Sequence, residues 1–393
     1  MADDTDNTIM KVLAKLLHPY PVGEFFDHHW TTQALRIPAD EPHQFASLFS
    51  WETLNYLLNF SPLQYPDLRL ALEGKVLDAN EIQQLTHWLQ QGATLIIDRV
   101  HEWVPDLAKW TAALRWELGY ATQINAYASF PQKQGFSSHY DTHDVFILQI
   151  EGCKTWNVFS ETLKFPLKDQ KSVTLSPPED PPYLNCMLSP GDVLYIPRGH
   201  WHYAVAGDTP SLHLTLGIHT KTGIDWLEWW ANQLRNNEEW RASLPLPQDT
   251  VDLKQHLQQL SQSLSEDLID SDRINEYIQY LNALGKPITK YSLPQQMGFN
   301  IFPQDQLTTF KTQPFQRVQI FDLPDVDSYR ITTQGKEVFL TGVPRAVWEK
   351  LFQQSEFTGE EVLQWLPDFD WELDLVPLLT RLVQEGILVV ESR

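Results

Sequence analysis

The chain has 393 residues, of which 42% are hydrophobic, enough to bury the cores of two or three domains. Its formal net charge of -22 at pH 7 excludes a nonspecific binder of nucleic acid or acidic membranes, because phosphate groups are bound by clustered Lys and Arg. A basic partner suits this charge better.

Cysteine use and hydropathy indicate where the protein works. The only two cysteines, Cys153 and Cys186, form no spaced metal motif and are too few for a disulfide framework, so we expect a reducing compartment. The first four residues lack the basic-then-apolar order of a signal peptide, and no apolar run is long enough to cross a bilayer. We therefore expect a soluble cytoplasmic protein with no membrane partner.

The first half of the chain predicts a cap followed by a β-rich domain. Short helical patterns, such as residues 51–58, precede a strand-like run at residues 93–97. From about residue 123 the sequence changes to short β-rich runs broken by Gly, Pro and Asp. These runs cover residues 124–129, 145–150, 155–159, 193–196 and 213–218. Many short strands at this spacing predict an antiparallel barrel or sandwich.

The second half predicts a helical module and a small terminal domain. Residues 224–284 have a helical pattern with three tryptophans near its start, Trp226, Trp229 and Trp230. The terminal elements expected after residue 296 are a strand near residues 338–340, helices around 345–353, 358–366 and 375–385, and a strand at 387–390. That order is typical of a winged-helix domain. The predicted α+β chain therefore has three parts: residues 1–222 with the cap and barrel, 223–296 with the helices, and 297–393 with the winged helix.

The predicted winged-helix domain is itself acidic. Residues 297–393 contain 8 Lys and Arg against 15 Asp and Glu, whereas DNA binding needs the reverse. We therefore expect no direct DNA binding and a docking or structural role.

One pattern in the β-rich domain carries chemistry. It is His139-Tyr140-Asp141, followed 61 residues after Asp141 by His202. Side chains at i and i+2 of an extended chain point to the same side, so the first His and the Asp can share a metal, with a distant strand supplying the third ligand. Two imidazoles and one carboxylate leave positions open on a ferrous ion, as non-haem oxygenases require. A His-X-Asp sequence alone is more often a solvated turn, and spacing does not choose between His200 and His202.

A lysine follows this pattern. Residues 145–150 alternate as a strand, a Glu-Gly pair reads as a turn, and Lys154, Trp156 and Val158 share one face of the next strand. We expect a hairpin whose lysine points where the metal ligands point. A buried lysine needs a partner, which the distal carboxylate of 2-oxoglutarate would provide. The alternative is a surface lysine on the outer face.

These residues lie in two stretches, 135–156 and 190–202, that resemble the JmjC-type ribosomal oxygenases, a family of cupin-like 2-oxoglutarate hydroxylases. Residues 25–30, 47–50 and 125–127 also fit, so the resemblance spans most of the chain. It implies a double-stranded β-helix (cupin/JmjC) barrel with an N-terminal cap, a helical dimerisation module and a C-terminal winged-helix domain. A homodimer is therefore expected, the alternative being that the helical module packs within one chain.

The resemblance also implies a role for each matching residue. It makes His139, Asp141 and His202 the ligands of Fe(II), with His202 chosen because it ends a Pro-X-Gly-X-X-His turn, and it puts His200 where the family often has an aromatic residue. It makes Lys154 the residue that binds the carboxylate of the cosubstrate 2-oxoglutarate. Three further polar residues are implied to line the cosubstrate pocket: Asn125, Tyr127 and Thr215. For these three, the alternative is a strand residue hydrogen-bonded to backbone.

The implied activity is hydroxylation of a side chain of a protein or peptide by an Fe(II)- and 2-oxoglutarate-dependent oxygenase. Family members act on ribosomal proteins, which are basic, so the acidic chain fits such a substrate. Thr142-His143 departs from the acidic or aromatic pair usual after the Asp, so the target side chain stays open. The alternatives are a tailoring hydroxylase of a ribosomally made precursor peptide, a noncatalytic cupin scaffold, and a cupin isomerase with zinc or manganese. An intact ligand set argues against the scaffold.

Overall fold

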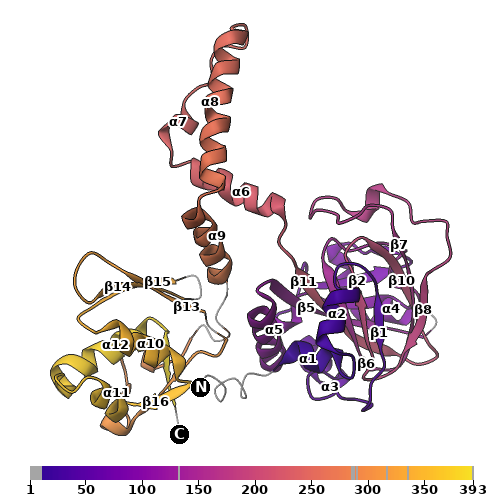
Figure 1. The fold of residues 1–393 in the computed structure, drawn as a ribbon. Helices are drawn as coiled ribbons and strands as arrows, with labels where there is room; N and C mark the ends of the chain where they lie inside the picture. The colour runs from indigo at the N-terminus through magenta and orange to yellow at the C-terminus, as the bar shows by residue number, and fades with distance from the viewer. Residues whose placement is uncertain are drawn as a thin grey trace. The chain divides into compact units, whose positions relative to one another are not determined.

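The computed structural model describes residues 11–391 apart from residues 132, 285–287, 289–290, 316 and 334–335. The chain divides into two units, Met1–Thr220 and Lys221–Arg393 (Figure 1). The division into three domains expected from the sequence is finer than this one. Among the described residues, no helix has the length and apolar character needed to span a membrane.

Short helices precede and flank the sheets of the first unit. They are α1 (Val12–Leu17), α2 (Val22–His28), α3 (Trp51–Phe60), α4 (Leu85–Gln90) and α5 (Pro105–Leu118). The helix predicted at residues 51–58 is confirmed by α3, which begins where the Ser50 hydroxyl accepts a hydrogen bond from the N–H of Thr53. α5 ends at Gly119, whose φ of 74° is the left-handed conformation that commonly stops a helix.

Two antiparallel sheets make up the rest of this unit. One has eight strands in the order β1-β9-β6-β11-β5-β4-β2-β3, and the other has three in the order β10-β7-β8. The strands are β1 (Leu35–Ile37), β2 (Leu68–Leu72), β3 (Lys75–Val76), β4 (Thr94–Ile97), β5 (Ala121–Ser129), β6 (Asp144–Glu151), β7 (Lys154–Glu161), β8 (Leu184–Leu188), β9 (Val193–Ile196), β10 (His200–Ala206) and β11 (Ser211–His219). All the β-rich runs between residues 93 and 218 are thereby confirmed as strands.

The central strand of the larger sheet sets the direction of the polar side chains. β11 lies between β5 and β6, with Thr215 opposite Asn125 on β5 and Ile147 on β6. Because side chains alternate between the two faces of a strand, His213 and Thr215 point to one face, and the fully buried Leu212, Leu214 and Leu216 point to the other. Residues from both sheets line one cavity, so the polar face of β11 looks into the space between the sheets.

The hairpin expected after residue 145 is wrong. β6 pairs with β9 and β11, whereas β7 pairs with β10 and β8, so the turn at Gly152 carries the chain from one sheet to the other. Gly152 has a φ of 64°, and a Cβ there would lie 2.0 Å from the carbonyl oxygen of Pro210. A short turn between two strands looks the same in sequence whether the strands pair or split between sheets. The expected direction of Lys154 is nevertheless confirmed, since it is 5% exposed and lines the cavity.

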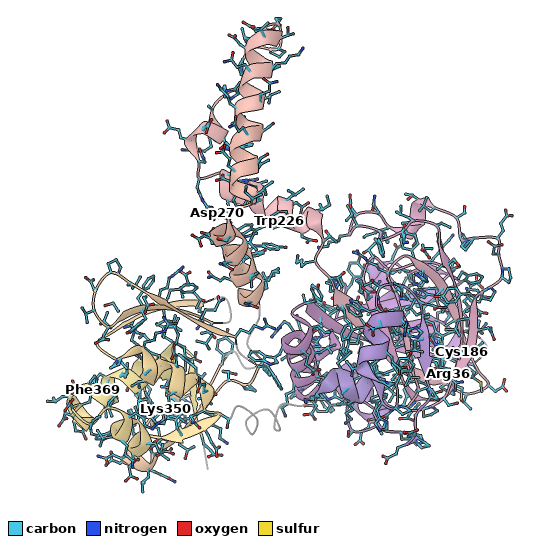
Figure 2. The ribbon with its side chains drawn as sticks, in the orientation of Figure 1. Arg36, Cys186, Trp226, Asp270, Lys350 and Phe369 are labelled. Carbon is cyan, nitrogen blue, oxygen red and sulfur yellow. The ribbon has the colours of Figure 1, made fainter. Side chains whose placement is uncertain are left out.

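The second unit begins with helices, as predicted for residues 224–284. They are α6 (Gly223–Leu234), α7 (Glu238–Arg241), α8 (Thr250–Leu268) and α9 (Ser271–Ala283). α6, which contains Trp226, starts at a capping box formed by Thr222 and Asp225. Asp270 caps α9 by accepting a hydrogen bond from the N–H of Asp272 (Figure 2).

The rest of the second unit combines two small sheets with three helices. The sheets have the orders β16-β12-β17 and β13-β14-β15. The strands are β12 (Thr309–Thr312), β13 (Val318–Asp322), β14 (Ser328–Thr333), β15 (Lys336–Thr341), β16 (Glu356–Thr358) and β17 (Leu388–Val390), and the helices are α10 (Arg345–Gln353), α11 (Gly359–Trp365) and α12 (Val376–Gln384). The three terminal helices and the strands at 338–340 and 387–390 are confirmed. They share one hydrophobic core, in which Trp348, Phe310 and Leu379 are fully buried.

Candidate metal centre

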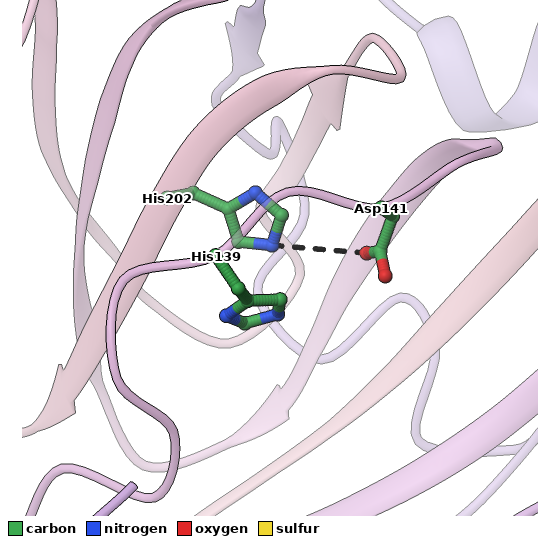
Figure 3. Close-up of side chains that lie close together, drawn as sticks. All are labelled: His139, Asp141 and His202. Carbon is green, nitrogen blue, oxygen red and sulfur yellow. Dashed lines mark ion pairs between the residues drawn. The ribbon is translucent and has the colours of Figure 1, made fainter. Parts of the chain in front are cut away.

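Three side chains of the first unit converge on one point. His139, Asp141 and His202 each offer a ligand atom, and these atoms all lie within 4.8 Å of one another. Nε2 of His202 lies 3.7 Å from a carboxylate oxygen of Asp141 (Figure 3). Two imidazoles and a carboxylate at this spacing form the ligand set predicted from the sequence.

Backbone hydrogen bonds hold the two histidines together. The N–H of His139 donates to the carbonyl of His202 at 3.1 Å, and the N–H of His202 donates back to the carbonyl of His139 at 2.7 Å. This isolated antiparallel bridge places His202 directly opposite His139. His139 belongs to none of the described strands, so the bridge takes the place of a regular ladder there.

Each histidine is oriented by a second backbone contact. Nδ1 of His139 lies 2.8 Å from the carbonyl oxygen of Ser137, and Nδ1 of His202 lies 3.0 Å from that of His200. A carbonyl oxygen only accepts, so Nδ1 carries the proton in each ring and Nε2 keeps its lone pair. Both rings are therefore in the tautomer that binds a metal through Nε2.

The charges of the cluster also suit a cation. Burial and the neighbouring His139 lower the pKa of His202 to about 4, so its ring is neutral at physiological pH. Burial alone would raise the pKa of the Asp141 carboxyl, but the neighbouring histidines, His143 first, outweigh it and lower that pKa. The result is an ionised carboxylate beside the neutral ring of His202.

His200 does not join this cluster. Its Nδ1 lies 2.8 Å from Tyr183 Oη, and its Nε2 lies 3.4 Å from a carboxylate oxygen of Glu161. The register between β10 and β7 shifts between His200 and His202, so the two rings do not follow simple alternation. The geometry thus selects His202, which spacing alone could not do.

A cavity of about 230 Å³ adjoins the three ligands. Its walls come from both sheets and from the segment before β6. They are formed by Arg69, Thr94, Tyr127, Gly135, Phe136, His139, Asp141, Ile147, Lys154, Trp156, His202, Tyr203, Ala204, His213 and Thr215. The Asp141 side chain is 32% exposed because it faces this space.

Lys154 is the buried cation of the cavity. Its Nζ donates a hydrogen bond to Ser129 Oγ at 2.9 Å, and Ser129 Oγ lies 3.1 Å from Thr94 Oγ1. Nζ also lies 5.8 Å from the ring centre of Trp156. Within the described part of the chain, no carboxylate pairs with this group, and burial lowers the pKa of Lys154 to about 7. A buried cation without a counter-charge is typical of a site that receives an anion.

The comparisons with known proteins converge on the same region. The family model for the JmjC domain matches residues 104–226, which include the three ligands and Lys154. Rat Ribosomal oxygenase 1 is 30% identical over 250 residues, covering 58% of this chain and 41% of that protein. This chain is a JmjC-domain protein related to the ribosomal oxygenases. The NO66 protein of Drosophila persimilis, named bifunctional lysine-specific demethylase and histidyl-hydroxylase, is 28% identical over 222 residues, which cover 53% of this chain and 32% of that protein. The similarity to these two curated relatives thus spans less than half of their own length.

A solved structure extends the likeness beyond the JmjC domain. YcfD, described as a ribosomal oxygenase from Escherichia coli in complex with cobalt and 2-oxoglutarate, has a TM-score of 0.63 at 18% identity. The similarity covers 94% of this chain and 98% of that one. The predicted α+β fold of the JmjC/cupin type is therefore confirmed for nearly the whole chain at this coarse level.

The three polar residues implied for the pocket of the JmjC domain have different positions. Tyr127 and Thr215 line the cavity. Burial raises the pKa of Tyr127 above its usual value, so the phenol keeps its proton. Asn125 is not among the lining residues, and its side-chain oxygen accepts a hydrogen bond from the N–H of Arg99 at 2.9 Å.

Sequence reasoning missed two polar residues that line this cavity, His213 and Arg69, and one residue behind its wall, Ser129. Ser129 is the hydrogen-bond partner of Lys154, and Arg69 forms a two-pronged contact with Asp98 at 2.5 and 2.7 Å. Strand alternation offered a signal for two of them, because Ser129 lies two positions after Tyr127 and His213 two before Thr215. No comparable signal pointed to Arg69, which reaches the cavity from β2.

Proposed function

We propose that this protein is an Fe(II)- and 2-oxoglutarate-dependent oxygenase that hydroxylates a side chain of a protein or peptide. One observation carries the proposal: a ligand set of two imidazoles and a carboxylate shares a cavity with a buried lysine that has no counter-charge among the residues that the structure describes. A dicarboxylic acid with a chelating 2-oxo acid end and a free distal carboxylate would satisfy both features at once.

The donor set fits a ferrous ion. His139 and His202 both hold Nδ1 on a backbone carbonyl and offer Nε2 as the ligand atom, Asp141 presents an ionised carboxylate, and a facial set of three leaves further coordination positions free. Bound Fe(II), with 2-oxoglutarate and dioxygen, supplies the oxidising power that hydroxylates a C–H bond. The residues of the chain then have to bind the metal and the cosubstrate, orient them, and shield them from bulk water.

The polar side chains of the cavity divide these tasks. Lys154, held by its hydrogen bond to Ser129, binds the distal carboxylate, because its ammonium group lines the cavity and is buried there. Tyr127 and Thr215 offer hydroxyl groups along the wall. The apolar surfaces of Trp156 and Ile147 exclude bulk water, which strengthens the charge pair at the lysine.

A basic protein, and a ribosomal protein first, is the proposed substrate. The formal net charge of -22 would attract and orient such a partner at long range. The related proteins from rat and Escherichia coli are both named ribosomal oxygenases. This substrate agrees with a cytoplasmic location, as do the two free cysteines.

Mass spectrometry of treated substrates tests this proposal. The full chain with Fe(II) and 2-oxoglutarate is incubated with ribosomal proteins of its own organism, and an Asp141→Ala variant serves as control. One ribosomal protein is expected to gain the mass of a single oxygen atom with the wild type only. If a precursor peptide encoded near the gene gains that mass while ribosomal proteins do not, the tailoring hydroxylase replaces the proposed substrate.

We also propose that the helical module pairs two copies of the chain. Apolar side chains are exposed along both long helices of the module: Val251, Leu257, Ile274 and Ile278. Burying such a face between copies is favourable because it removes apolar surface from water. Size-exclusion chromatography with light scattering is expected to give twice the mass of one chain, and a monomer at micromolar concentration would contradict the pairing.

The C-terminal elements are proposed to form a winged-helix domain that docks the substrate. The order α10-β16-α11-α12-β17 suits that fold, and the excess of acidic residues suits a basic partner. Deletion of residues 297–393 should raise KM for the protein substrate while metal binding stays unchanged. An unchanged KM would remove the docking role.

A further inference from the structure

His213 is buried in the wall of the cavity, and the proposed function gives this residue no role. It is 2% exposed and lies on β11, the central strand of the larger sheet. Its ring stacks on Tyr127 of the same sheet, with centroids 4.9 Å apart and an interplanar angle of 3°. Trp156, from the other sheet, meets it edge-on at 5.6 Å and 86°. Two aromatic rings therefore fix the position of the imidazole.

The imidazole has no hydrogen-bond partner within the described part of the chain. Nδ1 of His213 is buried and unpaired, and no hydrogen bond to the other ring nitrogen occurs among those residues. Buried polar groups in proteins are nearly always hydrogen-bonded, because an unpaired one loses its contacts with water without compensation. Since His213 lines the cavity, the missing partner is expected to be a ligand bound there.

The charge beside His213 indicates which kind of ligand this is. Burial, and then the positive charge of Lys154, keep the pKa of His213 well below its usual value. The ring is therefore neutral and has one N–H to donate. A ligand group that accepts from a neutral imidazole and also pairs with the neighbouring ammonium is an anion, and a carboxylate has enough lone pairs for both.

We propose that His213 donates a hydrogen bond to the distal carboxylate of the 2-oxo dicarboxylic acid and, with Lys154 and Ser129, selects for that carboxylate. This inference rests on the proposed function, since it assigns a specificity-determining residue to the same cavity. The stacking holds the ring rigidly, and a fixed hydrogen-bond donor discriminates better than a mobile one between ligands with and without a distal carboxylate.

Calorimetric binding to the full chain loaded with Mn(II) tests the inference without turnover. The two ligands are 2-oxoglutarate and 2-oxopentanoate, which differ only in a distal carboxylate against a methyl group. His213→Phe keeps an aromatic ring and removes the donor. It is expected to weaken 2-oxoglutarate binding by roughly 10- to 100-fold, the range of a hydrogen bond to a charged group. Binding of 2-oxopentanoate should stay within about 3-fold of wild type, since no such hydrogen bond is lost.

A second pair of variants covers the case in which His213→Phe fails to fold. The side chains introduced by His213→Asn and His213→Leu have similar volumes, but only the Asn side chain has an amide that can donate a hydrogen bond. The preference for 2-oxoglutarate over 2-oxopentanoate should therefore be larger in the Asn variant. Equal weakening of both ligands, or an unchanged preference between them, would overturn the role of His213. A wild type that binds Mn(II) but neither ligand would overturn the proposed function as well, which separates the two failures.

Discussion

Replacing His202 with Ala is expected to weaken Mn(II) or Fe(II) binding by more than about 100-fold, whereas replacing His200 with Ala should weaken it by less than about 10-fold. Loss of an outer-shell partner alone costs 10- to 100-fold in metal affinity, and loss of a ligand costs more. The ring of His202 is one of the three candidate metal ligands, while the ring of His200 contacts Tyr183 and Glu161. His200 supports its neighbour only through its backbone carbonyl, which the substitution keeps.

The two variants form a matched pair, because both remove an imidazole from the same strand. Mn(II) binding is followed by calorimetry, and circular dichroism with thermal melting checks that both variants fold. The reverse order of effects, with His200→Ala the more damaging, would mean that the ligand set is assigned wrongly.

Replacing Lys154 with Met should weaken 2-oxoglutarate binding on the order of 100-fold, because truncating one partner of a buried, hydrogen-bonded charge pair costs about 2–5 kcal/mol. The methionine fills most of the volume of the lysine stem, so Trp156 and its neighbours keep their packing. Ser129 then remains as a neutral donor only. An affinity within about 3-fold of wild type would show that the carboxylate binds elsewhere.

The pH dependence of this binding follows from the same lysine. The ammonium is the form that pairs with a carboxylate, and burial lowers the pKa of Lys154 to about 7. Below pH 7 the empty site is already mostly protonated, and above pH 7 the ligand must bring about the uptake of a proton. The dissociation constant should therefore rise roughly 10-fold per pH unit above 7 until the pKa of the complex is reached.

Lys154→Arg is the control for this proton uptake. A guanidinium stays charged across the whole range, so the steep rise should disappear even if the affinity falls. Calorimetry at pH 8 in buffers of different ionisation enthalpy measures the uptake directly. If the wild type takes up almost no protons when 2-oxoglutarate binds at pH 8, the lowered pKa of Lys154 is contradicted.

Local patterns in the sequence were sufficient for two of the three candidate metal ligands and for Lys154. His139 and Asp141 are two residues apart in an extended segment, so their shared direction could be predicted, and Lys154 follows from the alternation of its own strand. The strands and helices predicted from the sequence are present because their hydrophobic periods and turn residues are local signals as well.

Features that depend on tertiary pairing could not be predicted in this way. The false hairpin at Gly152 arose because strand partners are chosen across the fold, here in two different sheets. The choice of His202 over His200 depended on a register shift in β10. His213 looked like an ordinary strand residue until Tyr127 and Trp156 were seen on either side of it.

The most direct test of the central claim is the formation of succinate from 2-oxoglutarate by the full chain with Fe(II) and dioxygen, measured with and without a basic peptide. The wild type is expected to form succinate, faster with a suitable peptide, and His139→Ala is expected to form none. If the wild type binds Mn(II) and 2-oxoglutarate but makes no succinate under either condition, the protein is a binding scaffold and the proposed oxygenase activity is wrong.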